Sequence, residues 1–125
     1  MLAALRLIAY SDGATIVHCA AGKDRTGVVV ALALTEVGVE PAAVVEDYAL
    51  SAERVEAILA RLVARRTYAT DLVKDEPVDK HMPKPATMER LLAAMDEQHG
   101  GVRRWLRANG WTEQDAAALR RQLLD

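Results

Sequence analysis

Hydrophobic residues recur every three or four positions along most of this chain, a spacing that is typical of amphipathic helices. Turn-forming pairs such as Gly100-Gly101 and Asn109-Gly110 lie between these stretches and are expected to end helices. The run over residues 28–34 is apolar on nearly every side, so we expect a helix there at the centre of the fold. The pattern predicts helices around residues 2–10, 28–34, 41–50, 51–63, 91–95, 102–108 and 112–123.

Several residues mark expected element ends. Pro41 suits the first position of a helix, and Ser51 is a candidate N-cap for the helix that follows. Thr112 and Asp115 have the spacing of a capping box. The segment Lys74–Pro85 mixes prolines with charges and shows no periodicity, so it is predicted to be a loop or a lid.

The segment Ala14–His18 departs from the helical spacing. It is short, β-branched and almost continuously apolar, which predicts a buried parallel strand. Such a strand needs neighbours, because each buried backbone group without a partner costs about 1–3 kcal/mol. A second chain could supply them, the segment could lie in no sheet, or the chain could be the later part of a larger domain. The helix that leads directly into the segment favours the last interpretation.

Composition narrows the classes of function. A chain of 125 residues with 16 basic and 18 acidic side chains is expected to form one domain, and its net charge of −2 argues against a nucleic-acid binder. A single cysteine excludes an internal disulfide framework and a cysteine-rich zinc site. No apolar run approaches the roughly 18 residues of a transmembrane helix.

The apolar start of the chain, Met1–Tyr10, has no basic segment before it and contains Arg6, so we interpret it as a helix of the mature protein. An unpaired thiol is compatible with the cytosol, and we therefore expect a cytoplasmic protein. A secreted effector that has lost its leader remains an alternative.

The most informative stretch of the chain is His18–Gly27, where the only cysteine and an arginine lie on either side of a short glycine-containing loop. Backbone N–H groups of residues 20–25 can surround a phosphate there, aided by the positive end of the following helix. Arg25 can bind two phosphate oxygens at once. The same field lowers the pKa of the Cys19 thiol from about 8.5 toward roughly 3.5–7.5, which makes the thiolate a nucleophile.

The same residues also fit less specific interpretations. A cysteine beside a histidine is most often a buried structural thiol, but the surrounding Gly-Lys-Asp-Arg-Thr-Gly favours a phosphate loop. A nucleotide-binding P-loop needs Ser or Thr after Lys23, which this chain lacks, and His18 has no second ligand at metal-binding spacing. The Cys-x5-Arg spacing also occurs in arsenate reductases and some sulfur transferases.

Other residues keep two interpretations each. Tyr48 and Ser51 either line a pocket floor or serve as core and cap, and the second is favoured. The tail tryptophans are interpreted as helix anchors. An arginine-rich helix face either attracts acidic substrates or is simply solvated, and the second is favoured. His81 and Lys84 belong either to a lid or to an ordinary loop. The tryptophans are Trp105 and Trp111, and the arginines are Arg61, Arg65 and Arg66.

The stretch His-Cys-x-x-Gly-Lys-Asp-Arg-Thr-Gly resembles the signature of cysteine-dependent protein tyrosine and dual-specificity phosphatases, in their microbial tyrosine/serine and lipid-like branch. Weaker similarity continues at Glu46–Ser51, His99–Val102 and Leu119-Arg120. The resemblance implies an α/β fold, a central parallel sheet flanked by helices. Residues 1–125 would form only the C-terminal part of that domain, with one strand and most of its helices.

The resemblance also implies roles for the loop. Cys19 would attack phosphorus and form a cysteinyl-phosphate, and Arg25 would hold the equatorial oxygens. Thr26 would donate a hydrogen bond to the sulfur, and His18 would order the loop from behind.

The remaining loop residues complete the phosphate site that the resemblance implies. Ala20, Ala21 and Gly22 would offer backbone N–H groups to phosphate. Lys23 would add charge that suits multiply phosphorylated or phosphoinositide substrates. Asp24 would position water or donate a proton. Gly22 and Gly27 would permit tight turns and close helix packing.

One feature departs from the family pattern. The family's general acid is an aspartate upstream of the cysteine, and here only Asp12 lies upstream, in a turn at the wrong end of the predicted strand. We therefore expect the upstream sheet and the general-acid loop to be absent, a loss worth on the order of 10²–10⁴-fold in rate.

The resulting expectation is a phosphomonoesterase that acts on a phosphorylated protein or a phospholipid-like substrate, with no metal or organic cofactor. One alternative is a truncated, inactive phosphate-binding module. Another is an enzyme completed by a separate polypeptide or by an upstream segment.

Overall fold

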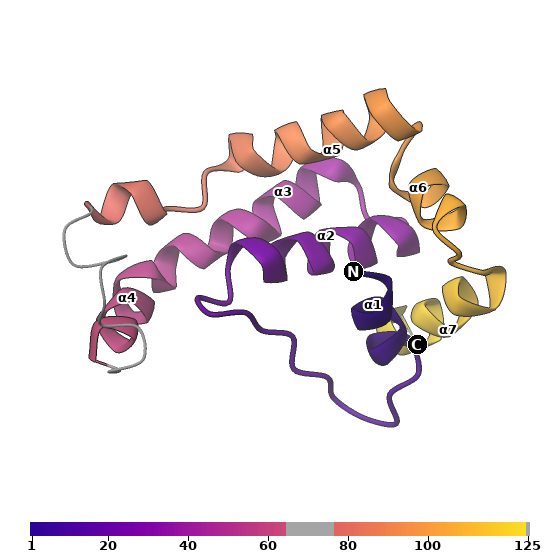
Figure 1. Ribbon diagram of the computed structural model, residues 1–125, viewed down its shortest axis with the longest axis horizontal. Helices are drawn as coiled ribbons and strands as arrows, with labels where there is room; N and C mark the ends of the chain where they lie inside the picture. Colours follow the sequence, from indigo (N-terminus) through magenta and orange to yellow (C-terminus); the bar gives the residue numbers. More distant parts are fainter. Residues whose placement is uncertain (65–76, 125) are drawn as a thin grey trace.

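The computed structural model describes residues 1–64 and 77–124, and the regular elements of those ranges are helices (Figure 1). The elements are α1 (Leu2–Ala9), α2 (Asp24–Val37), α3 (Pro41–Leu50), η1 (Ser51–Arg54), α4 (Val55–Ala64), η3 (Val78–His81), α5 (Pro85–His99), α6 (Val102–Ala108) and α7 (Glu113–Leu124). The expected α/β fold with a central parallel sheet is therefore wrong, since no strand occurs within the described residues.

The predicted strand Ala14–His18 is an extended segment that pairs with no other strand in the described part of the chain. It forms the open curve between α1 and α2 in Figure 1. Ile16 is 86% exposed, whereas Val17 is half-buried against the larger cluster of buried side chains, so the segment's apolar character leads to burial only in part. A strand exists only where a neighbour accepts its backbone hydrogen bonds, and the helical neighbours described here offer none.

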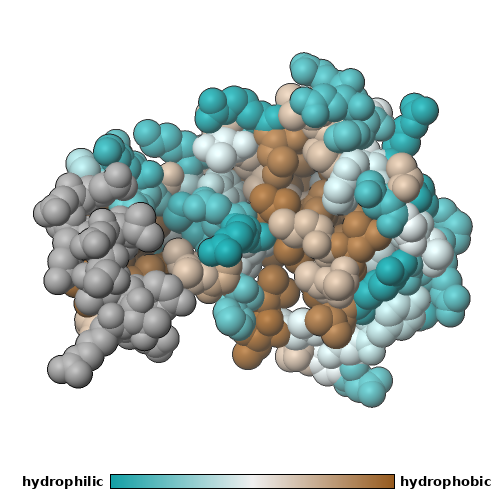
Figure 2. Space-filling view, viewed as in Figure 1, coloured by the Kyte–Doolittle hydropathy of each residue, from teal (hydrophilic) through white to brown (hydrophobic). Residues whose placement is uncertain are grey.

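Apolar residues reach the surface along this side of the molecule. Figure 2 shows them gathered over the middle of the face that carries α2 and the extended segment in Figure 1. Besides Ile16, Leu7 of α1 is 71% exposed.

Helix α2 lies at the centre of the fold, as its apolar run predicts. It packs against α1, α3, α6 and α7, and its residues contribute to two clusters of buried side chains. Leu32 belongs to the larger cluster with Leu5, Leu106 and Leu119, whereas Ala31 belongs to a smaller cluster with Val44, Tyr48 and Met88. The helix begins at Asp24, four residues before the apolar run. Its first turn consists of polar residues and glycine, so the apolar pattern does not reveal it.

Most predicted helix ends are confirmed. Gly38 ends α2 with a φ of 101°, a left-handed conformation that glycine adopts without strain, and Pro41 is the first residue of α3. Ser51 has helical backbone angles and begins η1, so its prediction as an N-cap is wrong. Of the predicted loop Lys74–Pro85, residues 74–76 lie outside the described residues, and the rest contains η3 and the start of α5.

The capping box at the start of α7 is confirmed and does more than cap the helix. The backbone N–H of Asp115 donates to Thr112 Oγ1 over 3.1 Å, and the backbone N–H of Thr112 donates to Asp115 Oδ2 over 3.0 Å. The same buried carboxylate accepts hydrogen bonds from the Arg6 guanidinium at 3.0 Å and from the Tyr10 hydroxyl at 3.0 Å. Asp115 therefore ties α1 to α7.

Replacing this carboxylate is expected to destabilise the fold. The hydrogen bond from Arg6 holds the pKa of Asp115 well below its usual range. A carboxyl whose pKa is lower in the folded state stabilises the fold above its unfolded pKa of about 3.9, and the effect fades as pH falls below that value. Asp115→Ala should lower the free energy of unfolding at pH 7 by about 2 kcal/mol, measured by urea denaturation.

Gln114→Ala, an exposed change on the same helix, serves as the control and should leave stability near that of the wild type. The difference between the wild type and Asp115→Ala should shrink as the pH is lowered from about 4 toward 2. Equal stability of the two variants at pH 7 would contradict the role of Asp115.

Candidate active site

The cysteine loop connects the extended segment to the N-terminus of α2. Lys23 occupies the N-cap position and Asp24 begins the helix. Gly22 has a φ of +67°, so the chain turns there in a conformation that side chains with a Cβ rarely adopt. The turn brings successive backbone N–H groups to the side of the loop on which Cys19 lies.

The loop changes the acidity of the Cys19 thiol. Burial raises its pKa, but hydrogen bonds from the Thr26 hydroxyl and from the backbone N–H groups of Thr26, Lys23 and Gly22 outweigh burial and lower the pKa to about 6. Cys19 therefore carries a thiolate at neutral pH, and the thiolate is the nucleophilic form of cysteine. The side chain is half-buried, so it remains open to small molecules.

Thr26 lies in the first turn of α2 with its hydroxyl buried. Within the described residues the Oγ1 atom has no hydrogen-bond partner other than Cys19, whose pKa it lowers. A buried hydroxyl without a partner is unfavourable, so the Thr26 hydroxyl gains free energy when its proton turns toward the negatively charged sulfur of Cys19.

A hollow of about 260 Å³ opens over the cysteine. One wall consists of the loop residues His18, Cys19, Ala20, Ala21 and Gly22. The other wall is α4, which contributes Ile58, Arg61 and Leu62. The sequence did not predict that this helix lines the hollow, because its apolar positions indicated only an amphipathic helix, although attraction of acidic substrates was one of the two interpretations of the face that carries Arg61. The available signal was the spacing of residues 58, 61 and 62, which places them on one helix face.

The structure brings some predicted site residues to the hollow and leaves others outside it. His18 lies at its edge, with Nδ1 3.4 Å from the Cys19 carbonyl oxygen. Arg25 is exposed in the first turn of α2 and is not part of the lining. Lys23 and Asp24 pair with each other, with Nζ 2.6 Å and 2.8 Å from the two carboxylate oxygens.

Tyr48 contacts the start of α2 from α3. Its hydroxyl donates to Asp24 Oδ1 over 2.9 Å, while its ring is buried. A Cβ at Gly27 would lie 2.7 Å from the ring's Cδ2 atom, so the missing side chain lets the two helices approach. The interpretation of Tyr48 as a core residue is thus correct, but it omits the hydrogen bond.

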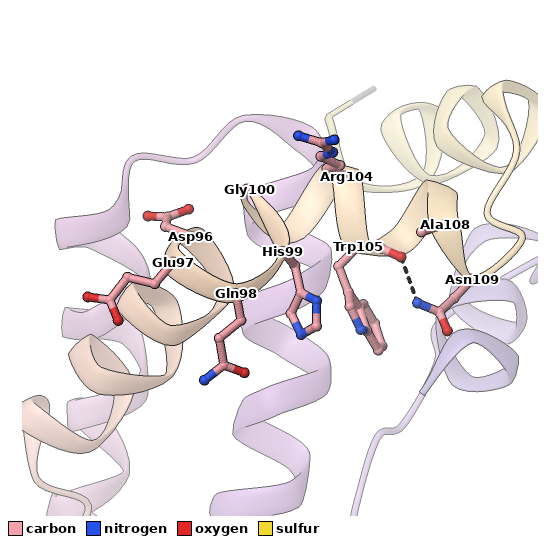
Figure 3. A pocket seen from close by; sticks show the side chains of 9 residues that line it. All are labelled: Asp96, Glu97, Gln98, His99, Gly100, Arg104, Trp105, Ala108 and Asn109. Atoms are coloured by element: carbon pink, nitrogen blue, oxygen red, sulfur yellow. Dashed lines mark hydrogen bonds between the residues drawn. The ribbon is translucent and has the colours of Figure 1, made fainter.

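A larger hollow of about 720 Å³ lies between the end of α5 and α6 and shares no residue with the Cys19 hollow (Figure 3). Its wall carries Asp96, Glu97 and Arg104 beside the paired rings of His99 and Trp105. Cys19, the only cysteine of the chain, lines the smaller hollow and not this one. Within the described residues, no helix has the length and apolar character needed to cross a membrane.

Comparison with known proteins shows which family this chain resembles. The whole chain, residues 1–125, matches the tyrosine phosphatase family. A tyrosine-protein phosphatase of Nostoc commune is 34% identical over 122 residues, which are 94% of this chain and 42% of that protein. The triple specificity protein phosphatase PtpB of Mycobacterium tuberculosis is 40% identical over 62 residues, 48% of this chain and 22% of that protein.

The chain thus spans less than half the length of these curated relatives. No solved structure gives a significant match.

The lowered pKa of Cys19 is testable by alkylation, since the chain has no other cysteine to react. The rate with iodoacetamide should rise with pH, pass its midpoint near pH 6 and then level off, because only the thiolate reacts. Thr26→Ala removes one stabilising hydrogen bond and should raise the midpoint by roughly one pH unit. Thr35→Ala removes another buried hydroxyl of α2 that lacks a partner, and it should leave the midpoint unchanged.

A wild-type midpoint near the value of an ordinary thiol, about pH 8.5, would show that the loop does not stabilise the thiolate.

Proposed function

Because this chain belongs to the tyrosine phosphatase family, we propose that it hydrolyses phosphomonoesters, phosphotyrosine first among them, through a cysteinyl-phosphate intermediate. The observation that carries the proposal is the half-buried Cys19 sulfur with its pKa lowered to about 6 by the loop's own donors. Donors that stabilise a thiolate also suit the oxygens of a phosphate, since both are anions at the end of a helix.

In the first step, the Cys19 sulfur attacks phosphorus while the bond from phosphorus to the ester oxygen breaks, and the departing oxygen takes a proton from water. The N–H groups of the loop hold the phosphoryl oxygens. In the second step, water attacks phosphorus, the bond to sulfur breaks, and inorganic phosphate leaves. The hydroxyl of Thr26 assists here, because it stabilises the thiolate that is regenerated.

Arg25 is assigned to the phosphoryl oxygens. Its exposed position in the first turn of α2 leaves it able to fold over a bound phosphate, and a guanidinium can hold two oxygens of the transition state. His18, at the edge of the hollow, is proposed to order the loop through the Cys19 carbonyl. Lys23 and Asp24 face each other as an ion pair, and the roles expected for Asp24 in water positioning or proton donation stay predictions.

The α4 wall suggests the kind of substrate. Ile58 and Leu62 offer apolar surface to an aromatic or acyl group that carries the phosphate, and Arg61 adds a positive charge beside it. This combination suits a phosphotyrosine side chain in an acidic peptide. It also suits phosphoserine, phosphothreonine or a phosphoinositide, and the name of the relative PtpB, a triple specificity protein phosphatase, is in keeping with a broad range.

A second function is favoured by two observations. Arg25 lies outside the hollow, and the extended segment Ala14–His18 has no partner within the described residues. On this alternative, the chain binds phosphate without turnover until a further polypeptide segment pairs with Ala14–His18 and supplies the general acid. On this alternative, the backbone of the segment, which pairs with no strand within the described residues, and the exposed Ile16 would be the surface to which the further segment binds.

A burst experiment distinguishes the two functions. Mixing the 125-residue chain with p-nitrophenyl phosphate should release a burst of nitrophenol equal to the concentration of active sites, followed by slower turnover. Cys19→Ser should abolish both phases, and Arg25→Ala should lower the rate by roughly 10²-fold or more. Arg104→Ala, an exposed arginine of the distant α6, should leave the rate unchanged.

Phosphate binding without a burst would support the binding module instead. If Cys19→Ser hydrolyses the substrate as fast as the wild type, Cys19 is not the nucleophile.

The contribution of Arg61 to substrate choice is tested by its removal. Arg61→Ala should raise KM for an acidic phosphotyrosine peptide by roughly three- to fivefold, because one charge beside the hollow is lost. KM for p-nitrophenyl phosphate, which has no acidic flank, should change little. Arg54→Ala removes an exposed charge of η1 that does not line the hollow, and equal effects of both variants would refute a role for Arg61.

A further inference from the structure

We propose that Tyr48 is a positioning residue that holds the Asp24 carboxylate, and with it the Lys23 ammonium, to one side of the phosphate loop. The proposal deepens the function proposed above and rests on the loop being an anion site. The Tyr48 hydroxyl donates to Asp24 Oδ1 over 2.9 Å, and Lys23 Nζ lies 2.6 Å from Oδ2 of the same carboxylate. Asp24 is thus fixed from two directions.

The tyrosine is a rigid anchor for this interaction. Its side chain is only 6% exposed and belongs to the buried cluster formed with Ala31, Val44 and Met88. The ring lies against Gly27, where even a Cβ atom would come within 2.7 Å of it. The hydroxyl can therefore move only if α2 and α3 move apart.

The hydroxyl also stays a donor at every practical pH. Burial raises the pKa of Tyr48 to about 12, and the hydrogen bond to Asp24 acts in the same direction. Lys23 pairs with Asp24 at the start of α2, and Arg90 of α5 lines the same hollow as Asp24 and Tyr48.

The position of the carboxylate matters because a phosphate is an anion. Asp24 and Tyr48 line a hollow of about 350 Å³ beside α5, and this hollow has no residue in common with the one over Cys19. Held there, the negative charge of Asp24 stays away from the Cys19 hollow, while the backbone N–H of the adjacent Lys23 remains directed at the sulfur. A released carboxylate could rotate toward the loop and repel a bound oxoanion.

Tungstate, a tetrahedral dianion, serves as the probe, with its affinity for the 125-residue chain measured by calorimetry. Tyr48→Phe removes the hydroxyl and keeps the ring, and it should weaken tungstate binding by roughly fivefold. In an Asp24→Ala background the same change should have no further effect, because the group on which Tyr48 acts is gone. A purely structural role of Tyr48 would lower affinity equally in both backgrounds.

Tyr10→Phe is the matched control. Its hydroxyl donates to Asp115 over 3.0 Å, so the change removes the same kind of hydrogen bond at a place remote from the loop. Thermal denaturation should show similar losses of stability for the two variants, with tungstate affinity reduced only in Tyr48→Phe.

The proposal is overturned if Tyr48→Phe binds tungstate as tightly as the wild type, if its effect persists in Asp24→Ala, or if the wild type binds no tungstate. The function proposed above fails on different evidence, namely unimpaired hydrolysis by Cys19→Ser or the absence of a burst.

Discussion

The candidate site depends on the balance between burial of one sulfur atom and the hydrogen bonds that reach it. Burial alone would keep the Cys19 thiol protonated, yet the donors of the loop lower its pKa to about 6. Those donors exist because Gly22 turns the chain and α2 begins directly afterwards. The rest of the structure serves this arrangement, since the packing of α2 against four other helices holds the start of α2 in place.

Local features of the structure could be predicted from the sequence. Helix ends at Gly38 and Pro41, and the capping box of Thr112 and Asp115, depend on residues only a few positions apart. The cysteine loop is of the same kind, because its N–H groups and its cysteine come from one continuous stretch. The family match over the whole chain agrees with the resemblance drawn from that stretch.

Features that depend on distant parts of the chain could not be predicted. Ala14–His18 has the composition of a strand, but a strand also needs a neighbour, and the sequence pattern does not show whether one is present. The α4 wall and the hydrogen bond from Tyr48 to Asp24 join residues far apart in the chain. In the sequence, the apolar residues of α4 indicate only an amphipathic helix, and Tyr48 is interpreted as a core residue. Only the arrangement of α2, α3 and α4 in space reveals these contacts.

The lowered pKa of Cys19 also makes this side chain sensitive to oxidation. A thiolate at neutral pH reacts with peroxide and is converted to a sulfenic acid. Many oxidised cysteines are protected by a disulfide with a neighbouring thiol, but Cys19 is the only cysteine of this chain. Residues 1–125 offer no such thiol to an oxidised Cys19, so a protecting disulfide needs a thiol from outside these residues, such as glutathione, that is small enough to enter the hollow beside α4.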